Sequence, residues 1–150
     1  MKIARELGLR VKDEGICLCM ARRIRENCVV CPYIGKLRVT DPLERYTVKL
    51  KTKDKRNRNV FLAAKAVGNM GRFIIHSYIA NCRNEELNGG DGPEIAIVAS
   101  HTIDPGEEIK ANYGPNQNFY HTFGFSQCVD KDRHDPLVKE EVHSRLRSGK

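Results

Sequence analysis

The chain has 150 residues and a mass of 17.0 kDa, a length that favours a single domain. Hydrophobic residues make up 40% and charged residues 30%, as in a globular protein, and the longest apolar run, Ile16–Ala21, is far below the roughly 18 residues of a membrane span. Lys and Arg outnumber Asp and Glu by 26 to 19, so a net charge of +7 favours acidic partners such as nucleic acid, although it also suits a merely solvated surface.

The pattern of the first half of the chain predicts short strands. The N-terminal residues do not resemble a secretory signal. A strand and its exit are predicted over 15–24, and a second apolar stretch over 28–37, where Pro32 favours an edge position. Asp41-Pro42 then breaks the pattern. The residues that alternate in the first strand are Ile16, Leu18 and Met20.

A basic hairpin is predicted next. Residues 46–51 alternate, with Val48 and Leu50 on one face, residues 52–59 form a charged turn, and 60–64 return. The hairpin could contact phosphates, or its cations could simply be solvated and guard a sheet edge. No aromatic residue interleaves with the basic run as a platform for base stacking. The run consists of Lys49, Lys51, Lys53, Lys55, Arg56 and Arg58.

The second half is also strand-rich. Residues 84–93 are predicted to be a loop because they hold three glycines and a proline, and 94–100 to be a strand. Asp104-Pro105-Gly106 has Pro and Gly in the central positions of a type II turn, and a short strand over 108–111 can follow. A short helix is predicted over 116–123.

The tail predicts an amphipathic helix. Asp135 can cap it, and Pro136 suits its first position. Val138, Val142 and Leu146 recur on one face. Before this tail, the many short strands indicate a mainly β, β-rich α+β domain of several small sheets.

The cysteines favour reduced thiols, because no signal peptide directs the chain to an oxidising compartment. The pairs Cys17-x-Cys19 and Cys28-x2-Cys31 leave a zinc site open, but only the second has the usual spacing. Small core residues on strands are the simpler interpretation, and no metal site is expected. The six cysteines are Cys17, Cys19, Cys28, Cys31, Cys82 and Cys128.

Two segments carry a family resemblance. Gly68–Asn81 reads GNMGRFIIHSYIAN, and Gly106–Gly114 reads GEEIKANYG. In this order they resemble the two signature motifs of SET-domain lysine methyltransferases, G-N-x-x-R-F-I-N-H-S-C-x-P-N and G-E-E-L-T-x-D-Y-G. Gly15–Gly35 is similar to the opening strands of the family, and 113–125 to a stretch of its Rubisco-methyltransferase-like branch, which methylates both histone and non-histone lysines.

The resemblance implies a fold, a reaction and a site. A SET-type catalytic domain over 1–125, with a knot-like C-terminal crossing, would precede a C-terminal extension over 126–150 that holds the amphipathic helix. The domain would transfer a methyl group from S-adenosylmethionine to a lysine of a substrate protein. Tyr113 matches the catalytic tyrosine, whose hydroxyl orients the lysine amine. The positions expected to bind the cofactor are Gly15, Ile16, Cys17, Arg72, Phe73, Ile75, His76 and Tyr113.

Several positions depart from the family pattern. Ile75 replaces an asparagine that contacts the cofactor, and Cys17 replaces the second glycine of the opening G-x-G. Ala111 stands where an aromatic residue often limits methyl number. Tyr78 replaces a zinc-binding cysteine, and no C-x-C-x4-C follows, so no zinc cluster is expected. A SET-like interaction module without catalysis therefore stands beside the enzyme as an alternative.

Two further interpretations concern His76 and the partners. A buried histidine is usually a hydrogen-bonded core residue, and His76 could otherwise serve as a base for Cys82 as nucleophile, although no third orienting group is evident. By analogy with the family, substrates could include a histone tail, and the hairpin Lys49–Arg58 could contact nucleosomal DNA. The family and the charge favour a nuclear over a cytoplasmic location.

Overall fold

Short strands make up nearly all of the regular structure. The computed structural model describes residues 7–12, 15–40 and 46–112. Within these residues, ten strands form three sheets, and the single helical element is one 3₁₀ turn. The predicted strand-rich architecture is confirmed. The predicted break at 41–42, both predicted tail helices and the C-terminal crossing lie outside the described residues.

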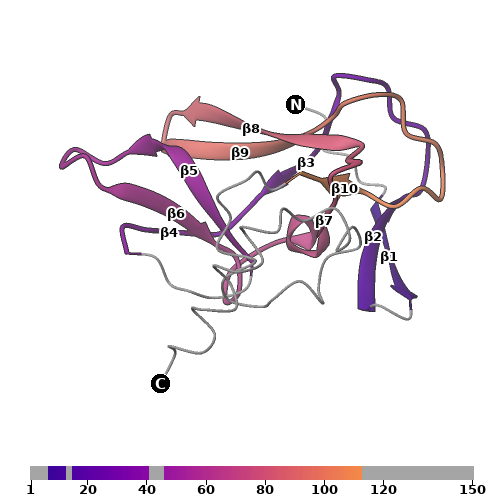
Figure 1. Ribbon diagram of the computed structural model, residues 1–150, viewed down its shortest axis with the longest axis horizontal. Coiled ribbons are helices and arrows are strands. Elements are labelled where there is room, and N and C mark those ends of the chain that lie inside the picture. The colour runs from indigo at the N-terminus through magenta and orange to yellow at the C-terminus, as the bar shows by residue number, and fades with distance from the viewer. Residues whose placement is uncertain (1–6, 13–14, 41–45, 113–150) are drawn as a thin grey trace, which may run out of the picture.

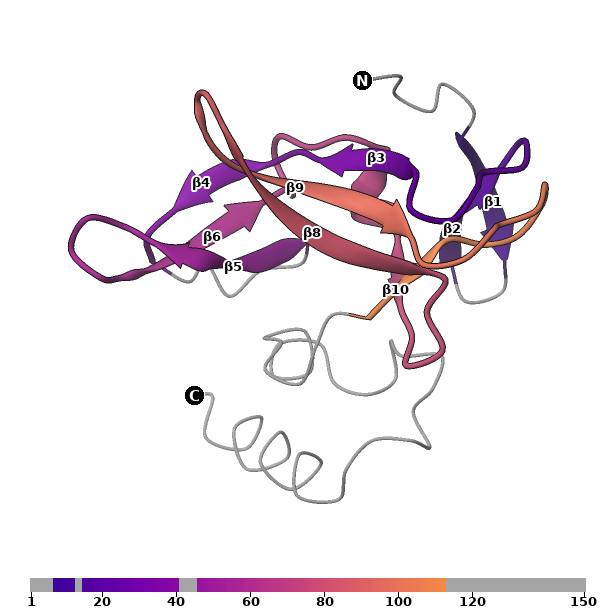
Figure 2. The same cartoon turned by 90° about the horizontal axis from the view of Figure 1, so that it is seen from above.

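The sheets are arranged around a central one (Figures 1 and 2). A five-stranded sheet, β3-β9-β8-β10-β7, lies between a three-stranded sheet, β4-β6-β5, and a two-stranded sheet, β1-β2. Strand β10 runs parallel to both β7 and β8, and the other pairs are antiparallel. The elements are β1 (Leu7–Lys12), β2 (Gly15–Met20), β3 (Val29–Tyr33), β4 (Lys36–Arg38), β5 (Thr47–Lys53), β6 (Asn59–Ala63), η1 (Met70–Phe73), β7 (Ile75–His76), β8 (Cys82–Gly89), β9 (Gly92–Ala99) and β10 (Lys110–Ala111).

Strand β2 is buried on both faces, which the predicted alternation missed. Leu18 and Met20 are buried as expected, but Ile16 on the same face is 49% exposed. On the opposite face, Cys17 and Cys19 are each only 3% exposed. A strand that is covered on both sides does not show the polar and apolar alternation of a half-buried strand, so the pattern was only partly informative.

Local signals predicted other parts of the fold correctly. Strand β3, which contains Pro32, is an edge strand. The hairpin of β5 and β6 forms, with Leu50 in the core and Val48 packed against it. The turn at 104–106 is confirmed as type II in character, because Gly106 has φ +86° and the Glu107 amide donates to the Asp104 carbonyl at 3.2 Å.

The loop predicted over 84–93 is wrong. Strand β8 pairs with β9 through all of its residues, from Cys82 opposite Ala99 to Gly89 opposite Gly92. Two residues then join the strands in a tight turn. The polar sequence of β8 is held by its partners rather than by its own strand propensity, because β-propensity depends largely on context.

Glu86 on β8 links the central sheet to the three-stranded sheet. The register of β5 against β6 shifts between Lys49 and Lys53, and we call this irregularity of the strand the bulge. The amides of Lys51 and Thr52 donate instead to the Glu86 carboxylate, at 2.6 and 2.9 Å. One carboxylate therefore accepts hydrogen bonds from two amides that the bulge would otherwise leave unsatisfied.

One apolar core joins the sheets. The largest side chains that are fully buried include Leu18, Ile97, Ile103 and Ile109. Within the described ranges, no helix is long and apolar enough to cross a membrane. The core brings together β2, which belongs to the opening segment of the resemblance, with η1 and β10, which belong to the two motifs.

Candidate active site

The two sequence motifs lie side by side. Strand β7 of the first motif pairs in parallel with β10 of the second, with Ile75 opposite Lys110 and His76 opposite Ala111. The amide of Ser77 then donates to the Ala111 carbonyl at 3.2 Å. The His-Ser pair of the first motif is therefore fixed by backbone pairing to the residues that lead into Tyr113.

The opening strand joins the same place. The amide of Ile109 donates to the Leu18 carbonyl at 2.8 Å, and that of Met20 donates to the Glu107 carbonyl at 3.0 Å. The amide of Gly106 donates back to Met20 at 2.7 Å. The opening strand and the two motifs therefore meet. We call the set of β2, residues 68–81 and residues 106–112 the motif junction.

Two glycines let the chain approach itself closely before β7. A Cβ added at Gly68 would lie 2.6 Å from the Ala64 carbonyl oxygen, and one at Gly71 would lie 3.0 Å from the Pro32 oxygen. Asn69, between them, donates through Nδ2 to the Pro32 carbonyl at 2.7 Å and accepts the Ile34 amide at 3.3 Å. The G-N-x-G part of the motif thus lets η1 pack closely against the end of β3.

Arg72 and Phe73 lie beside Tyr46. The guanidinium carbon of Arg72 is 4.9 Å from the Phe73 ring centre and 5.8 Å from that of Tyr46, and the two rings pack edge to face. Arg72 Nη1 donates to the carbonyls of Ala64 and Lys65. Its Nε is buried and has no hydrogen-bond partner. A ligand that offers a hydrogen-bond acceptor to the Arg72 Nε would satisfy this buried donor.

His76 and Ser77 are both 1% exposed. The His76 ring packs edge to face against Tyr78 with centres 4.8 Å apart, and the Ser77 hydroxyl accepts the Ile79 amide at 3.0 Å. Ile75, which precedes them, is half-buried. Hydrogen bonds and ring packing hold the backbone of residues 75–79 in place. The Ile75 side chain has no polar atom with which to contact a cofactor.

Asn81 is a positioning residue that the sequence interpretation left without a role. It is 7% exposed, its Nδ2 donates to the Glu108 carbonyl at 2.8 Å, and its Oδ1 accepts the Lys110 amide at 2.8 Å. One side chain therefore ties the end of the first motif to the second. Its place as the last residue of the motif was the available signal.

Three further predicted site residues lie at the start of β2. Gly15 begins β2 opposite Lys12, the exposed Ile16 follows it, and the buried Cys17 pairs with Arg10. Tyr113, the predicted catalytic residue, lies just outside the described residues.

The cysteines in the described ranges are free thiols. Burial raises the pKa of Cys31 to about 12, and burial together with the nearby Cys31 raises the pKa of Cys82 to about 12 against the charge of Arg83. A thiol that stays protonated is a poor nucleophile, which argues against the pairing of His76 with Cys82. Cys28 is exposed, so it is not the core residue that was expected.

The pair Cys17 and Cys19 has its two sulfurs 3.8 Å apart. No group of three or more His, Cys, Asp or Glu side chains that could hold a metal occurs in the part of the chain that the structure describes. The zinc interpretation therefore receives no support from these residues.

Comparison with known proteins identifies the family. The sequence profile of the SET domain matches residues 15–114, two thirds of the chain. The chain belongs to the SET-domain family. The motif junction described above is therefore the part of a SET domain where its signature segments meet.

The relatives of this SET domain are lysine methyltransferases. The histone-lysine N-methyltransferase trr of Drosophila melanogaster is 28% identical over 113 residues, which cover 69% of this chain and 4% of trr. The N-lysine methyltransferases KMT5A-A of Xenopus laevis and KMT5A of Xenopus tropicalis are each 38% identical over 52 residues, or 35% of this chain and 16% of theirs. The chain thus spans a small part of the length of these curated relatives.

Solved structures share the fold. CpSET8 from Cryptosporidium matches with a TM-score of 0.63 at 22% identity, over 74% of this chain and 58% of its own. ATXR5, solved in complex with a mono-methylated histone H3.1, matches with a TM-score of 0.63 at 18% identity, over 75% and 61%. These matches confirm the predicted SET-type arrangement of small sheets.

Proposed function

We propose that this SET domain is a protein-lysine N-methyltransferase that uses S-adenosylmethionine. The observation that supports it most is the pairing of β7 with β10, which brings His76 and Ser77 against the residues that lead into Tyr113. The family and its relatives support the same reaction. We place the catalytic domain at 1–125 and treat 126–150 as an extension.

Residues of the motif junction would hold the cofactor. The buried and unpartnered Nε of Arg72 fits an anionic acceptor such as the carboxylate of the cofactor. Gly15, Ile16, Cys17 and Phe73 are assigned with it, together with the backbone of Ile75 and His76. When bound, S-adenosylmethionine supplies a methyl group on a sulfonium centre that an amine can displace.

Tyr113 would act on the substrate lysine. Its hydroxyl would orient the amine for an in-line approach to the methyl group. The amine must be neutral, and an apolar surrounding favours loss of its proton because desolvation disfavours the charged form. Ile109 and Ala111, which are buried and precede Tyr113 in the chain, would supply part of such a surrounding.

The substrate class is a lysine in a protein, with histone tails as the first candidates. Trr is named a histone-lysine methyltransferase, and ATXR5 was solved with a histone. A histone substrate would place this protein in the nucleus. Ala111, in place of an aromatic residue, leaves room for higher methylation states.

Replacing the tyrosine hydroxyl tests the reaction. Tyr113→Phe should reduce methyl transfer to histone proteins at least 100-fold, while S-adenosylmethionine binding stays within a few-fold, because the hydroxyl acts on the amine. Thr102→Val, which removes a hydroxyl from an exposed position outside the motif junction, is the control and should keep its activity. Full activity of Tyr113→Phe would contradict the assigned role.

A SET-like interaction module without catalysis is the second candidate. It is favoured by the Ile75 side chain, which cannot make polar contacts, and by Cys17 at a position where the family has glycine. In that case the unaltered protein should not bind S-adenosylmethionine, and Ile75→Asn should raise the affinity into the measurable range. Binding by the unaltered protein excludes this candidate.

A further inference from the structure

Cations gather on one face of the three-stranded sheet. Arg38 and Lys49 both pair with Phe61, on opposite sides of β6, and Lys36 pairs with Ala63. Directly paired residues point to the same face of a sheet, and so do residues two apart along a strand. Lys53, paired with Asn59 on this same face, completes the set. We call Lys36, Arg38, Lys49 and Lys53 the basic face.

The other face of this sheet belongs to the core. Leu62, Val60 and Leu50 are buried there, whereas all four cations of the basic face are exposed. None of the four forms an ion pair within the described ranges, and Lys53 only donates to the side chain of Asn59. Among the described residues, no acidic side chain therefore neutralises the positive charge of this face.

Two acidic residues, Glu86 and Asp91, lie near this sheet. Glu86 accepts the two bulge amides and lies near Lys51, which is not one of the four cations of the basic face. The turn between β8 and β9, which contains Asp91, approaches β4: the Leu37 side chain is 3.9 Å from the Cβ position of Gly92. Leu37 pairs with Leu62 and so belongs to the opposite face.

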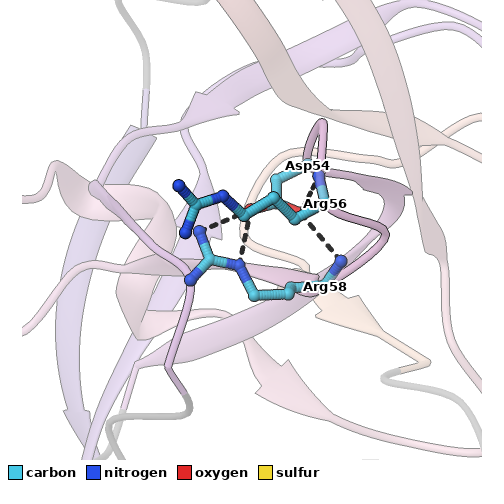
Figure 3. Close-up of polar contacts among 3 residues, drawn as sticks. All are labelled: Asp54, Arg56 and Arg58. Carbon is cyan, nitrogen blue, oxygen red and sulfur yellow. Dashed lines mark hydrogen bonds and ion pairs between the residues drawn. The ribbon is translucent and has the colours of Figure 1, made fainter.

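The tip of the hairpin is fixed by Asp54 (Figure 3). Its Oδ1 accepts the amides of Arg56 and Arg58 at 2.9 and 2.8 Å, and its Oδ2 accepts Arg58 Nε at 2.7 Å. Asn57 completes the turn with φ 59°. Arg58 is thus neutralised within the tip, while Lys55 and Arg56 are exposed and extend the basic face.

We propose that the basic face and this tip bind the phosphate backbone of duplex DNA. Lysines are point charges suited to phosphates, and phosphate contacts supply sequence-independent affinity. Phe61, the aromatic residue of this face, is only 4% exposed, so it cannot stack on unpaired bases as single-strand binding requires. Nothing in this proposal depends on methyl transfer, because the surface is built without the motif junction.

The test is the salt dependence of binding to a short labelled DNA duplex, followed by fluorescence anisotropy. The triple variant Lys36→Gln, Lys49→Gln, Lys53→Gln should lower the slope of log affinity against log salt by about 3, about 1 for each lost phosphate contact. The control is Arg22→Gln, Arg23→Gln, Arg25→Gln, which removes the same formal charge from an exposed loop beyond β2, where Arg23 pairs with Asp104 at the surface. The control should keep the slope.

Three results would overturn the proposal. These are no binding of the unaltered protein at low salt, an equal loss in both triple variants, and equal competition by poly-glutamate, which would indicate an acidic protein partner. Both variants are checked for cooperative thermal unfolding and for S-adenosylmethionine binding. Lost DNA binding with retained cofactor binding separates this surface from the proposed enzyme site.

Discussion

The motif junction and the basic hairpin carry their chemistry in different ways. In the junction, buried backbone groups and small side chains hold three distant segments together, and His76, Ser77 and Asn81 are almost fully covered. In the hairpin, the apolar residues face the core and the functional groups are exposed cations. Substitutions in the junction should therefore change folding and cofactor binding together, whereas those of the exposed cations of the hairpin should change neither.

The largest effect is expected at Gly68. In Gly68→Ala, the new Cβ would lie 2.6 Å from a backbone oxygen, so the chain must shift, and the free energy of unfolding should fall by about 3 kcal/mol. Urea denaturation measures this change. Gly90→Ala is the matched control, because no atom lies within 4 Å of its Cβ position, and it should stay within about 1 kcal/mol. Equal stability of the two variants would contradict the close packing.

Asn81→Ala should have the next largest effect. It leaves the Glu108 carbonyl and the Lys110 amide without their partner, which should cost about 2 kcal/mol in the free energy of unfolding. It should also weaken S-adenosylmethionine binding, since β10 loses its tie to the first motif. Asn88→Ala, at an exposed position of β8, should change neither measurement. A stable Asn81→Ala protein with unchanged binding would remove the positioning role.

A smaller and pH-dependent effect is expected at Glu86. Partial burial raises the pKa of this carboxyl, but hydrogen bonds from the Thr52 hydroxyl and from the amides of Lys51 and Thr52 outweigh it, so the pKa lies below its usual value. The carboxylate therefore stabilises the fold at neutral pH, and this contribution is lost as the pH falls below about 4. Glu86→Gln should cost about 1 kcal/mol at neutral pH, less in acid.

Glu85→Gln is the control for this comparison, since Glu85 only pairs with Arg83 on the surface. Chemical denaturation of both variants across the acidic range gives the measurement. If the loss in free energy of unfolding caused by Glu86→Gln does not become smaller in acid, the charge of the carboxylate is not what stabilises the bulge.

The sequence predicted those parts of the fold that depend on local signals and missed those that depend on distant partners. The β5–β6 hairpin and the turn at 104–106 follow from alternation and from Pro-Gly chemistry, which are local. Strand β8 was missed because β9 and the bulge amides stabilise a polar segment that its own composition marks as a loop. Cys17 and Cys19 are buried by neighbours on both faces, which no alternation can reveal.

The motif junction could be predicted only from the family resemblance, not from local sequence patterns. Periodicity does not predict that residues 68–81 meet residues 106–112, because that contact depends on parallel pairing of two-residue strands. The family resemblance brought the segments together, and the structure adds the roles of Asn81 and of the two close glycines, whose reasons are contacts between distant backbone atoms. Ion pairs and the fixed tip of the hairpin also depend on side-chain geometry.

The most direct test of the central claim is a calorimetric titration of the protein with S-adenosylmethionine and its demethylated product, paired with thermal unfolding. If the motif junction is a cofactor site, both ligands should bind, and ligand at 100 times its Kd should stabilise the fold by about 2.7 kcal/mol. For a domain of this size, that raises Tm by several degrees. A protein that melts cooperatively but shows neither heat nor stabilisation at millimolar ligand would contradict the enzymatic account.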